Sequence, residues 1–363
     1  MCVSLNQNCI SMKSLPKHIS DPVYSKRVSY NRFDLFFLKY IRDERDLPFI
    51  YFTLKIVLVL IPFAIFLFTN VLFGWIWWLA ALLYVALNVV FFIGTFALMF
   101  HCTAHRTLFK KEFNYLNYIL PYFIAPFFGH MADTYYSHHV GMHHAENNLE
   151  DDESTTMPYQ RDSIHDFLLY YSRFMLSGIY KAVVYFKKRN RKKLMYGALL
   201  GQIYIVLFCI ILFSMNWKAS LCVFIFPYFF YRFVAMFGNW AQHAFIDPFD
   251  PGNSYKNSIT CINSKYNWQC WNDGYHISHH LKQNLHWTEH PKYFQDTIIN
   301  YSANNAVVFY KIDFIEVSLY LLIKRYDLLA KNFVNIGNRF KSDKEIIFFL
   351  KERVQRFEFA AKS

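Results

Sequence analysis

The chain has 363 residues, of which 55% are hydrophobic, 21% are aromatic and only 18% are charged. The mean hydropathy of +0.12 excludes an ordinary soluble domain of this length and predicts an integral membrane protein. The formal net charge is +12. Because the basic runs flank long apolar stretches, they exclude a nucleic-acid-binding protein and fit the excess of Lys and Arg on the cytoplasmic side of membrane proteins.

The N-terminal segment, residues 1–47, is polar and lacks the apolar stretch of a cleavable signal peptide. We therefore expect this segment to be cytosolic and the first membrane span to act as its own targeting signal. Residues 32–44 combine aromatic and charged side chains in an amphipathic pattern. This pattern predicts a helix that either lies along the membrane surface or packs on the rest of the protein as a soluble helix.

Four apolar runs are each long enough for the roughly 20 residues that a spanning helix needs. They cover residues 49–69, 71–100, 195–215 and 219–245. A short tip joins the members of each pair, and the open ends of both pairs are charged, whereas the tip of the first pair has no Lys or Arg. The positive-inside rule therefore predicts two membrane hairpins whose open ends, like both chain termini, face the cytosol.

The second span is longer than a bilayer requires. A helix over residues 73–105 would rise about 50 Å, against a hydrocarbon core of about 30 Å. The end of this helix should therefore project into the cytosol, as should the end of the fourth span. Residues 114–129 are apolar but short, and two prolines interrupt them, so they predict a re-entrant or interfacial segment and not a further span.

These elements predict an all-α integral membrane protein with four transmembrane helices in two hairpins. Its expected parts are the cytosolic N-terminal segment 1–47, a membrane domain over residues 48–295 and a cytosolic helical tail over residues 296–363. Within the membrane domain, residues 101–194 and 246–295 form a cytosolic helical cap.

Nine of the 15 histidines fall in four groups that this topology places on the cytosolic side of the membrane. The groups are His101 and His105; His139, His143 and His144; His243; and His276, His279 and His280. Spacings of three and four residues put imidazoles on one face of a helix, and neutral imidazole is a ligand for iron, zinc, copper and nickel. Eight or nine nitrogens are too many for one ion, so the cap should hold a site for two metal ions.

The second group has an unusual spacing. On a straight helix, His139 and His143 align, but His144 points about 140° away from His139. Either the helix is distorted there or His144 serves the other metal ion. His138 is a weaker ligand candidate than His139, because no histidine lies four residues after it.

Several side chains near the histidine groups are candidates for supporting roles. The carboxylates of Glu146, Asp247 and Asp273 could each orient an imidazole by accepting its distal N–H, and simple solvation at the surface is the alternative. His286 and His290 form a further HxxxH pair, which we expect to support the site or to line the cap.

The histidine groups form four motifs, namely HxxxH at 101–105, HxxxHH at 139–144, NxxxH at 239–243 and HxxHH at 276–280. Together these motifs resemble those of the membrane fatty acid desaturase and hydroxylase superfamily, and the resemblance covers about residues 50–295. It implies an oxygen-dependent enzyme with two iron ions, in which the nine histidines are the iron ligands. It also implies that Asn239 contacts iron through a water molecule or positions a ligand.

The resemblance implies a fatty acyl chain or lipid as substrate and the introduction of a double bond. The usual second motif of the desaturases is HxxHH, and the HxxxHH found here is also similar to that of the membrane alkane hydroxylases. Hydroxylation of a lipid or alkyl chain is therefore the alternative. A zinc-dependent membrane hydrolase is a third and less favoured reading, because three or four histidines suffice for its site.

Electrons for this chemistry must come from outside the chain, because the sequence has no haem-binding HPGG motif and no flavin-binding fingerprint. Cytochrome b5 or a ferredoxin is the expected donor. The basic run at residues 187–193 is explained by topology alone, and a docking patch for an acidic donor is the alternative. We expect the protein to reside in the endoplasmic reticulum.

Overall fold

The computed structural model describes residues 16, 18–69, 71–130 and 132–357. Residues 1–15 of the expected N-terminal segment and residues 358–363 of the expected tail lie outside the described residues, as do positions 17, 70 and 131. The described part of the chain is mostly helical, as the sequence predicted.

Four of the described helices are long and apolar enough to cross a membrane. They run over Glu44–Phe68, Gly74–His105, Lys192–Met215 and Trp217–Gln242. Each lies within a few residues of a predicted span, so the prediction of four transmembrane helices is confirmed. Only 17% to 33% of the apolar stretch of each helix is buried inside the protein. The apolar side chains that remain exposed can meet lipid.

Three of the four spans consist of several consecutive helical segments. The first contains η1 (Glu44–Asp46), α2 (Leu47–Lys55), η2 (Ile56–Leu60) and α3 (Ile61–Phe68). The second contains α4 (Gly74–Leu87), η3 (Asn88–Phe92) and α5 (Ile93–His105), and the third is α9 (Lys192–Met215). The fourth contains α10 (Trp217–Ser220), η8 (Leu221–Ile225) and α11 (Phe226–Gln242). The π turns η2 and η8 directly precede segments that begin with a proline in their first turn, where a backbone donor is missing.

The cap is built from short helices between and after the hairpins. Before α9 lie η4 (Lys111–Tyr118), η5 (Leu120–Ile124), η6 (Ala125–Phe128), α6 (Ala132–His138), η7 (His139–His143), α7 (His144–Glu146) and α8 (Ile164–Lys188). After α11 lie α12 (Ser254–Asn257), β1 (Ile259–Ile262), α13 (Lys265–Gln269), α14 (His276–Leu281), η9 (Trp287–Glu289) and α15 (His290–Asp296). The segment predicted to be re-entrant or interfacial forms short 3-10 and π turns and no spanning helix.

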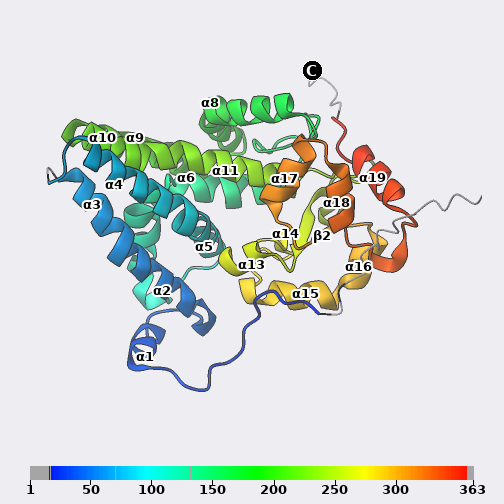
Figure 1. Cartoon of the computed structure of the whole chain (residues 1–363), viewed down its shortest axis with the longest axis horizontal. Helices are drawn as coiled ribbons and strands as arrows, with labels where there is room; N and C mark the ends of the chain where they lie inside the picture. The colour runs from blue at the N-terminus through cyan, green and yellow to red at the C-terminus, as the bar shows by residue number, and fades with distance from the viewer. Residues whose placement is uncertain (1–15, 17, 70, 131, 358–363) are drawn as a thin grey trace, which may run out of the picture.

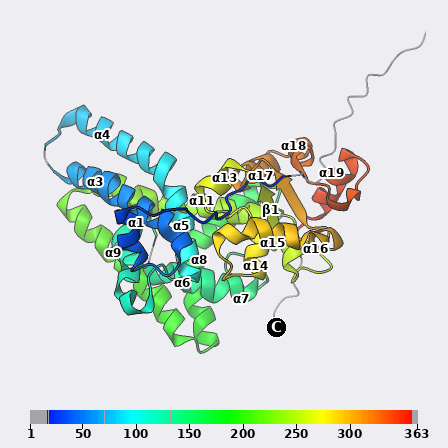
Figure 2. The same ribbon diagram turned by 90° about the horizontal axis from the view of Figure 1, so that it is seen from below.

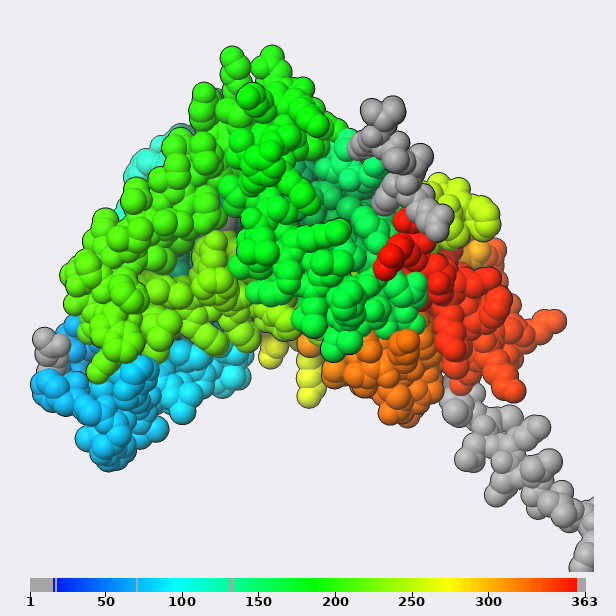
Figure 3. Space-filling model, turned by 90° about the horizontal axis from the view of Figure 1, so that it is seen from above, coloured from blue at the N-terminus to red at the C-terminus, as the bar shows by residue number. Residues whose placement is uncertain are grey.

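The helix α1 and the C-terminal elements lie on different sides of this core (Figure 1). At the N-terminal end, α1 (Arg32–Leu38) begins with a capping box between Asn31 and Asp34. The C-terminal elements are α16 (Ile298–Ala303), β2 (Val307–Tyr310), α17 (Phe314–Leu322), α18 (Tyr326–Asn332), η10 (Ile336–Asn338) and α19 (Asp343–Glu352). Figures 1 and 2 show the ends of the hairpins at α3, α4 and α9 on one side of the molecule and the C-terminal helices on the other. The space-filling view shows the same division, with the first hairpin in blue and cyan and the C-terminal elements in orange and red (Figure 3).

One element departs from the all-helical expectation. Strands β1 and β2 form a parallel pair in which Ile259 lies opposite Val307. Both strands have only four residues and are almost completely buried. A buried apolar stretch of this length has no periodicity that distinguishes a strand from a helix, so the sequence pattern did not reveal the pair.

Arg161 fixes the end of the fourth span against the cap and the C-terminal segment. Its side chain is fully buried and donates hydrogen bonds to the carbonyl oxygens of Ala244 at 2.8 Å, Arg353 at 3.1 Å and Gln355 at 2.6 Å. The indole N–H of Trp240, near the end of α11, donates to the carbonyl oxygen of Arg161 at 2.9 Å. These bonds hold the chain rigidly on both sides of His243.

Candidate metal centre

Four parts of the fold bring the nine predicted ligand histidines together in two groups. They are the end of α5, the turn formed by η7 and α7, the residue after α11, and α14. The first group contains His101, His105, His139, His144 and His279, and the second contains His143, His243, His276 and His280. In each group, one nitrogen from every ring lies within 4.8 Å of the corresponding nitrogen of each other ring. The sequence thus identified every histidine of both groups found among the described residues, but not their division.

The Nε2 atoms of the five-histidine group lie at the distances expected around a single ion. They are separated by 2.9 Å between His101 and His279, 2.8 Å between His279 and His144, 3.0 Å between His144 and His139, and 3.1 Å between His139 and His105. Two nitrogens bound at about 2.1 Å to one ion and at a right angle to each other would be about 3.0 Å apart. The spacing therefore fits one metal ion in this group.

The ring nitrogens of the four-histidine group are similarly close to one another. The Nε2 atom of His276 lies 3.2 Å from that of His243 and 3.0 Å from that of His280. The ring of His143 completes the group, with centroid distances of 5.2 Å to His243 and 5.1 Å to His280. This group therefore fits a second metal ion beside the first.

The unusual spacing of the second motif is accommodated by a π turn. The backbone N–H of His144 donates to the carbonyl oxygen of His139, which is the i→i+5 bond of a π-helix. The helix is thus distorted, which was the first of the two alternatives, and His139 and His144 belong to the same group. His143, and not His144, turns toward the other group.

Two residues that sequence reasoning missed orient imidazoles of the four-histidine group. Asp152 accepts a hydrogen bond from Nδ1 of His143 at 2.7 Å, and the backbone oxygen of Asn257 accepts one from Nδ1 of His243 at 2.8 Å. In each of these rings, the other nitrogen, Nε2, remains available as a metal ligand of the four-histidine group. The chain reverses direction after α7, where Asn147 has a φ of 51°, and this reversal places Asp152 next to His143. No local sequence pattern signals this contact.

Asp273 lies beside an imidazole of the five-histidine group, and its role in orienting that ring stays a prediction. Its Oδ1 lies 3.4 Å from Nδ1 of His101, and its Oδ2 accepts a hydrogen bond from the Tyr266 hydroxyl at 2.7 Å. The turn that places Asp273 depends on Gly274, because a Cβ atom there would lie only 2.5 Å from the backbone oxygen of Cys261.

The other three candidate supporting residues have different partners. Glu146 accepts a hydrogen bond from Tyr185 and lies 3.2 Å from Arg189. The Asn239 amide donates to the backbone oxygen of Ser154 at 3.0 Å and to the Tyr170 hydroxyl at 2.7 Å. Asp247, the third carboxylate considered from the sequence, forms an ion pair with Arg353 at 3.0 Å. Because Ser154 lies two residues after Asp152, the bond from Asn239 stabilises the segment that contains Asp152.

His286 and His290 belong to neither group. His286 bonds to Asp46 at 2.9 Å through Nε2, and His290 bonds to the Ser278 hydroxyl at 2.7 Å through Nδ1. His138, the weaker ligand candidate, is also outside both groups. These three residues therefore support or surround the centre.

Burial favours the neutral form of six imidazoles of the centre. It lowers the pKa of His243 to about 3, and the neighbouring His143 adds to the effect. Burial, followed by neighbouring imidazoles, also lowers the pKa well below its usual value for His139, His144, His276, His279 and His280. A neutral imidazole is the form that binds a metal ion, so little proton displacement would oppose binding at pH 7.

The donor set fits two transition-metal ions. It consists of nine ring nitrogens with the spacing described above, and Asp152 and Asn257 hold two of the rings from behind by hydrogen bonds. Imidazole donors of this kind suit iron, and also zinc and copper.

The comparisons with known proteins agree with this geometry. The family described as "Fatty acid desaturase" matches residues 76–309, which is more than half of the chain. The matched region begins in α4, ends in β2 and contains all nine histidines. Comparisons with curated proteins and with solved structures gave no match.

Proposed function

Because the chain belongs to the fatty acid desaturase family, we propose that it binds two iron ions in its nine-histidine centre and uses molecular oxygen to introduce a double bond into a fatty acyl chain. The observation that carries this proposal is the division of nine histidines into adjacent groups of five and four. A single zinc ion of a hydrolase would need only three or four of them.

The side chains of the centre bind and orient, while the metal ions supply the oxidising chemistry. When bound, two iron ions activate molecular oxygen so that an unactivated C–H bond can be broken. Asp152 and Asn257 hold the distal nitrogens of two imidazoles, which fixes these rings before any metal arrives. Seven of the nine histidines are buried, which limits the access of bulk water to the centre.

The π turn bears on the choice between desaturation and hydroxylation. Although the second motif has one residue more than the usual HxxHH, η7 returns His139 and His144 to the same group. The HxxxHH spacing therefore removes no histidine from the centre and does not by itself favour the hydroxylase alternative. We propose desaturation as the reaction, with hydroxylation as the outcome that would replace it.

The position of the centre supports a lipid substrate and an external electron donor. His105 and His243 lie at the ends of the second and fourth spans, where an acyl chain can rise from the bilayer. The basic run at residues 187–193 is exposed between α8 and α9 and could bind an acidic donor such as cytochrome b5 or a ferredoxin. In the endoplasmic reticulum, the protein would have access to both the lipid substrate and the electron donor.

Expression in a host with a simple lipid composition tests the proposal. We would compare wild type with His279→Ala and with His165→Ala, a control whose side chain is 85% exposed and lies outside both groups. Wild type and the control should produce acyl chains lighter by two hydrogens and should contain two irons per chain, whereas His279→Ala should produce none. A gain of one oxygen would show hydroxylation. One zinc per chain, or no new lipid that depends on His279, would contradict the proposal.

A further inference from the structure

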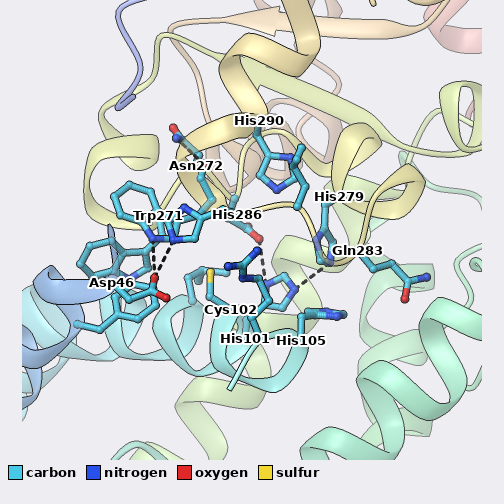
Figure 4. A pocket seen from close by; sticks show the side chains of 16 residues that line it. Asp46, His101, Cys102, His105, Trp271, Asn272, His279, Gln283, His286 and His290 are labelled. Atoms are coloured by element: carbon cyan, nitrogen blue, oxygen red, sulfur yellow. Dashed lines mark hydrogen bonds and ion pairs between the residues drawn. The ribbon is translucent and has the colours of Figure 1, made fainter. Parts of the chain in front are cut away.

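A small cavity lies beside the five-histidine group, on the side of the first span (Figure 4). Its volume is about 40 Å³. His101, His105 and His279 line it on one side, and Asp46 and His286 line it on the other. A water molecule needs roughly 10–15 Å³ of such space, so the cavity can hold a few waters but no acyl chain.

Asp46 is a buried carboxylate in the wall of this cavity, with two fixed donors. Asp46 is only 5% exposed. His286 donates from Nε2 at 2.9 Å and Trp287 donates from its indole N–H at 3.2 Å, and both reach Oδ1. The backbone N–H of Thr288 donates to Nδ1 of His286 at 3.2 Å, so it is Nε2 that carries the proton donated to Asp46. Neither of these two donors reaches Oδ2.

A charged rim connects Asp46 with the surface. Arg106, which also lines the cavity, donates to Asp43 at 2.9 Å, and Arg45 pairs with Asp43 at 2.7 Å. Arg45 also pairs with Glu289, whose side chain is 46% exposed. Ion pairs therefore run from Glu289 at the surface through Arg45 and Asp43 to Arg106, which lines the same cavity as Asp46.

The remaining titratable groups of the cavity wall are already engaged. Asp273 accepts from Tyr266 at 2.7 Å and lies 3.4 Å from His101. His290 is bonded to Ser278 at 2.7 Å. The Cys102 thiol also lines the cavity, but a thiol is a weak hydrogen-bond donor. Asp46 is thus the carboxylate of this wall whose hydrogen bonds come from His286 and Trp287 and from no histidine of the two groups.

The proposed reaction needs a supply of protons at this place. Molecular oxygen, two electrons from a reduced donor protein, two protons from solvent and two hydrogen atoms from the acyl chain give one double bond and two water molecules. Hydroxylation would likewise consume two electrons and two protons, and would release one water. Either outcome requires protons to reach a buried centre and water to leave it.

We propose that Asp46 is the proton-transfer residue of this enzyme and that the cavity is the path for water between Asp46 and the five-histidine group. This inference rests on the proposed function. The Asp46 carboxylate takes up a proton from water at the rim and passes it on to a water in the cavity. His286 and Trp287 are positioning residues, because they hold Oδ1 of this cavity-lining side chain.

Variants of Asp46 test this role against a purely structural one. Asp46→Asn keeps the shape of the side chain but cannot transfer a proton, and Asp46→Ala leaves space for a small acid. We expect both variants to retain two irons per chain and to lose at least tenfold in turnover at pH 7. Added formate should restore Asp46→Ala but not Asp46→Asn. Asp34→Asn is the matched control, because Asp34 is a buried carboxylate of the same region that pairs with Arg27 and Tyr51 and does not line the cavity.

Turnover of Asp46→Asn within twofold of wild type, or an iron-loaded Asp46→Ala that formate fails to restore, would overturn the inference. Loss of iron from Asp46→Asn would show a structural role instead and would equally overturn it. A larger solvent isotope effect in Asp46→Asn than in wild type is the further expected sign of a slowed proton step.

A second measurement does not depend on lipid turnover. In the metal-free protein, at a pH low enough for Asp46 to be protonated, the infrared difference between wild type and Asp46→Asn isolates the carboxyl band of Asp46, which should shift in D₂O within the mixing time. The absence of that exchange would contradict a path to solvent. If the exchange is seen but wild type modifies no lipid, the proposed function fails and the water path stands. If wild type modifies lipid and Asp46→Asn does so equally well, only the proton-transfer role fails.

Discussion

Asp152 holds His143 through Nδ1 and is itself held by the backbone N–H of Asn148 at 3.2 Å and of Ser154 at 2.9 Å. Burial alone would raise the pKa of the Asp152 carboxyl, but His143 and the hydrogen bonds lower it well below the usual value. The carboxylate is therefore ionised and fixes the tautomer of His143, with the proton on Nδ1 and the lone pair of Nε2 aimed at the four-histidine group.

Replacing Asp152 by Asn should weaken metal binding in the four-histidine group. The amide cannot accept at both oxygen positions, so the ring of His143 loses its fixed orientation, and loss of such a partner typically lowers metal affinity about 10- to 100-fold. Iron retention during dialysis against increasing chelator concentrations measures the effect. Asp151→Asn is the control, because Asp151 forms an exposed ion pair with Arg189 at 2.8 Å. Equal retention in both variants would contradict this role of Asp152.

The buried imidazoles predict how the stability of the metal-free protein depends on pH. Their pKa is lowered in the folded state, to about 3 for His243, against an ordinary value near 6.5. Below about pH 6.5 the unfolded chain therefore binds protons that the folded chain does not. The free energy of unfolding should fall as the pH falls from about 6.5 toward 4, by up to about 1.4 kcal/mol per pH unit for each such ring.

Thermal unfolding of the metal-free protein at several pH values measures this dependence. The transition should vary little from pH 7 to 8 and should move to lower temperature below pH 6.5. His279→Gln, which is neutral at every pH, should reduce the slope. A transition that does not change between pH 7.5 and 5 would show that these rings are accessible to protons in the folded state.

At the scale of helices and strands, long patterns could be predicted and short ones could not. The spans were predicted to within a few residues, because about 20 apolar residues in a row have no soluble alternative. The nine histidines were found because helical spacing and topology act together. Their division could not be found, because it depends on the π turn η7, where Gly141 packs so closely that a Cβ atom would lie 2.8 Å from the Leu194 side chain. Contacts of that kind come only from the folded chain.

The π turn also makes a prediction of its own. Deleting Val140 would turn HxxxHH into the HxxHH of the usual second motif, and an α-helical turn would then place the three imidazoles on one face. We expect the deletion variant to retain two irons per chain. Inserting an alanine after Val140 instead should abolish binding of at least one iron, because it turns His139 away from the other two. Iron analysis of both variants checks this, and loss of iron on deletion would mean that the centre requires the π geometry itself.

At the scale of the whole molecule, the centre joins parts of the chain that lie far apart in the sequence. His101 and His105 come from the first hairpin, His243 follows the second, and the remaining rings come from the cap between and after them. Each metal ion would therefore cross-link at least two of these parts. Since the unfolded chain cannot gather so many imidazoles, metal binding should stabilise the folded cap.

Loading with iron should raise the unfolding temperature of the purified protein. Binding to the folded state alone contributes about 2.7 kcal/mol when the free metal is at 100 times its dissociation constant, which corresponds to a shift of several degrees. A chelator should reverse the shift. His279→Ala should lose most of it, since His279 contacts His101 and His144 within its group, whereas the exposed His165→Ala should keep it. A protein that unfolds at the same temperature with and without iron would show that the cap is held by its apolar core alone, and that the centre contributes to chemistry but not to the fold.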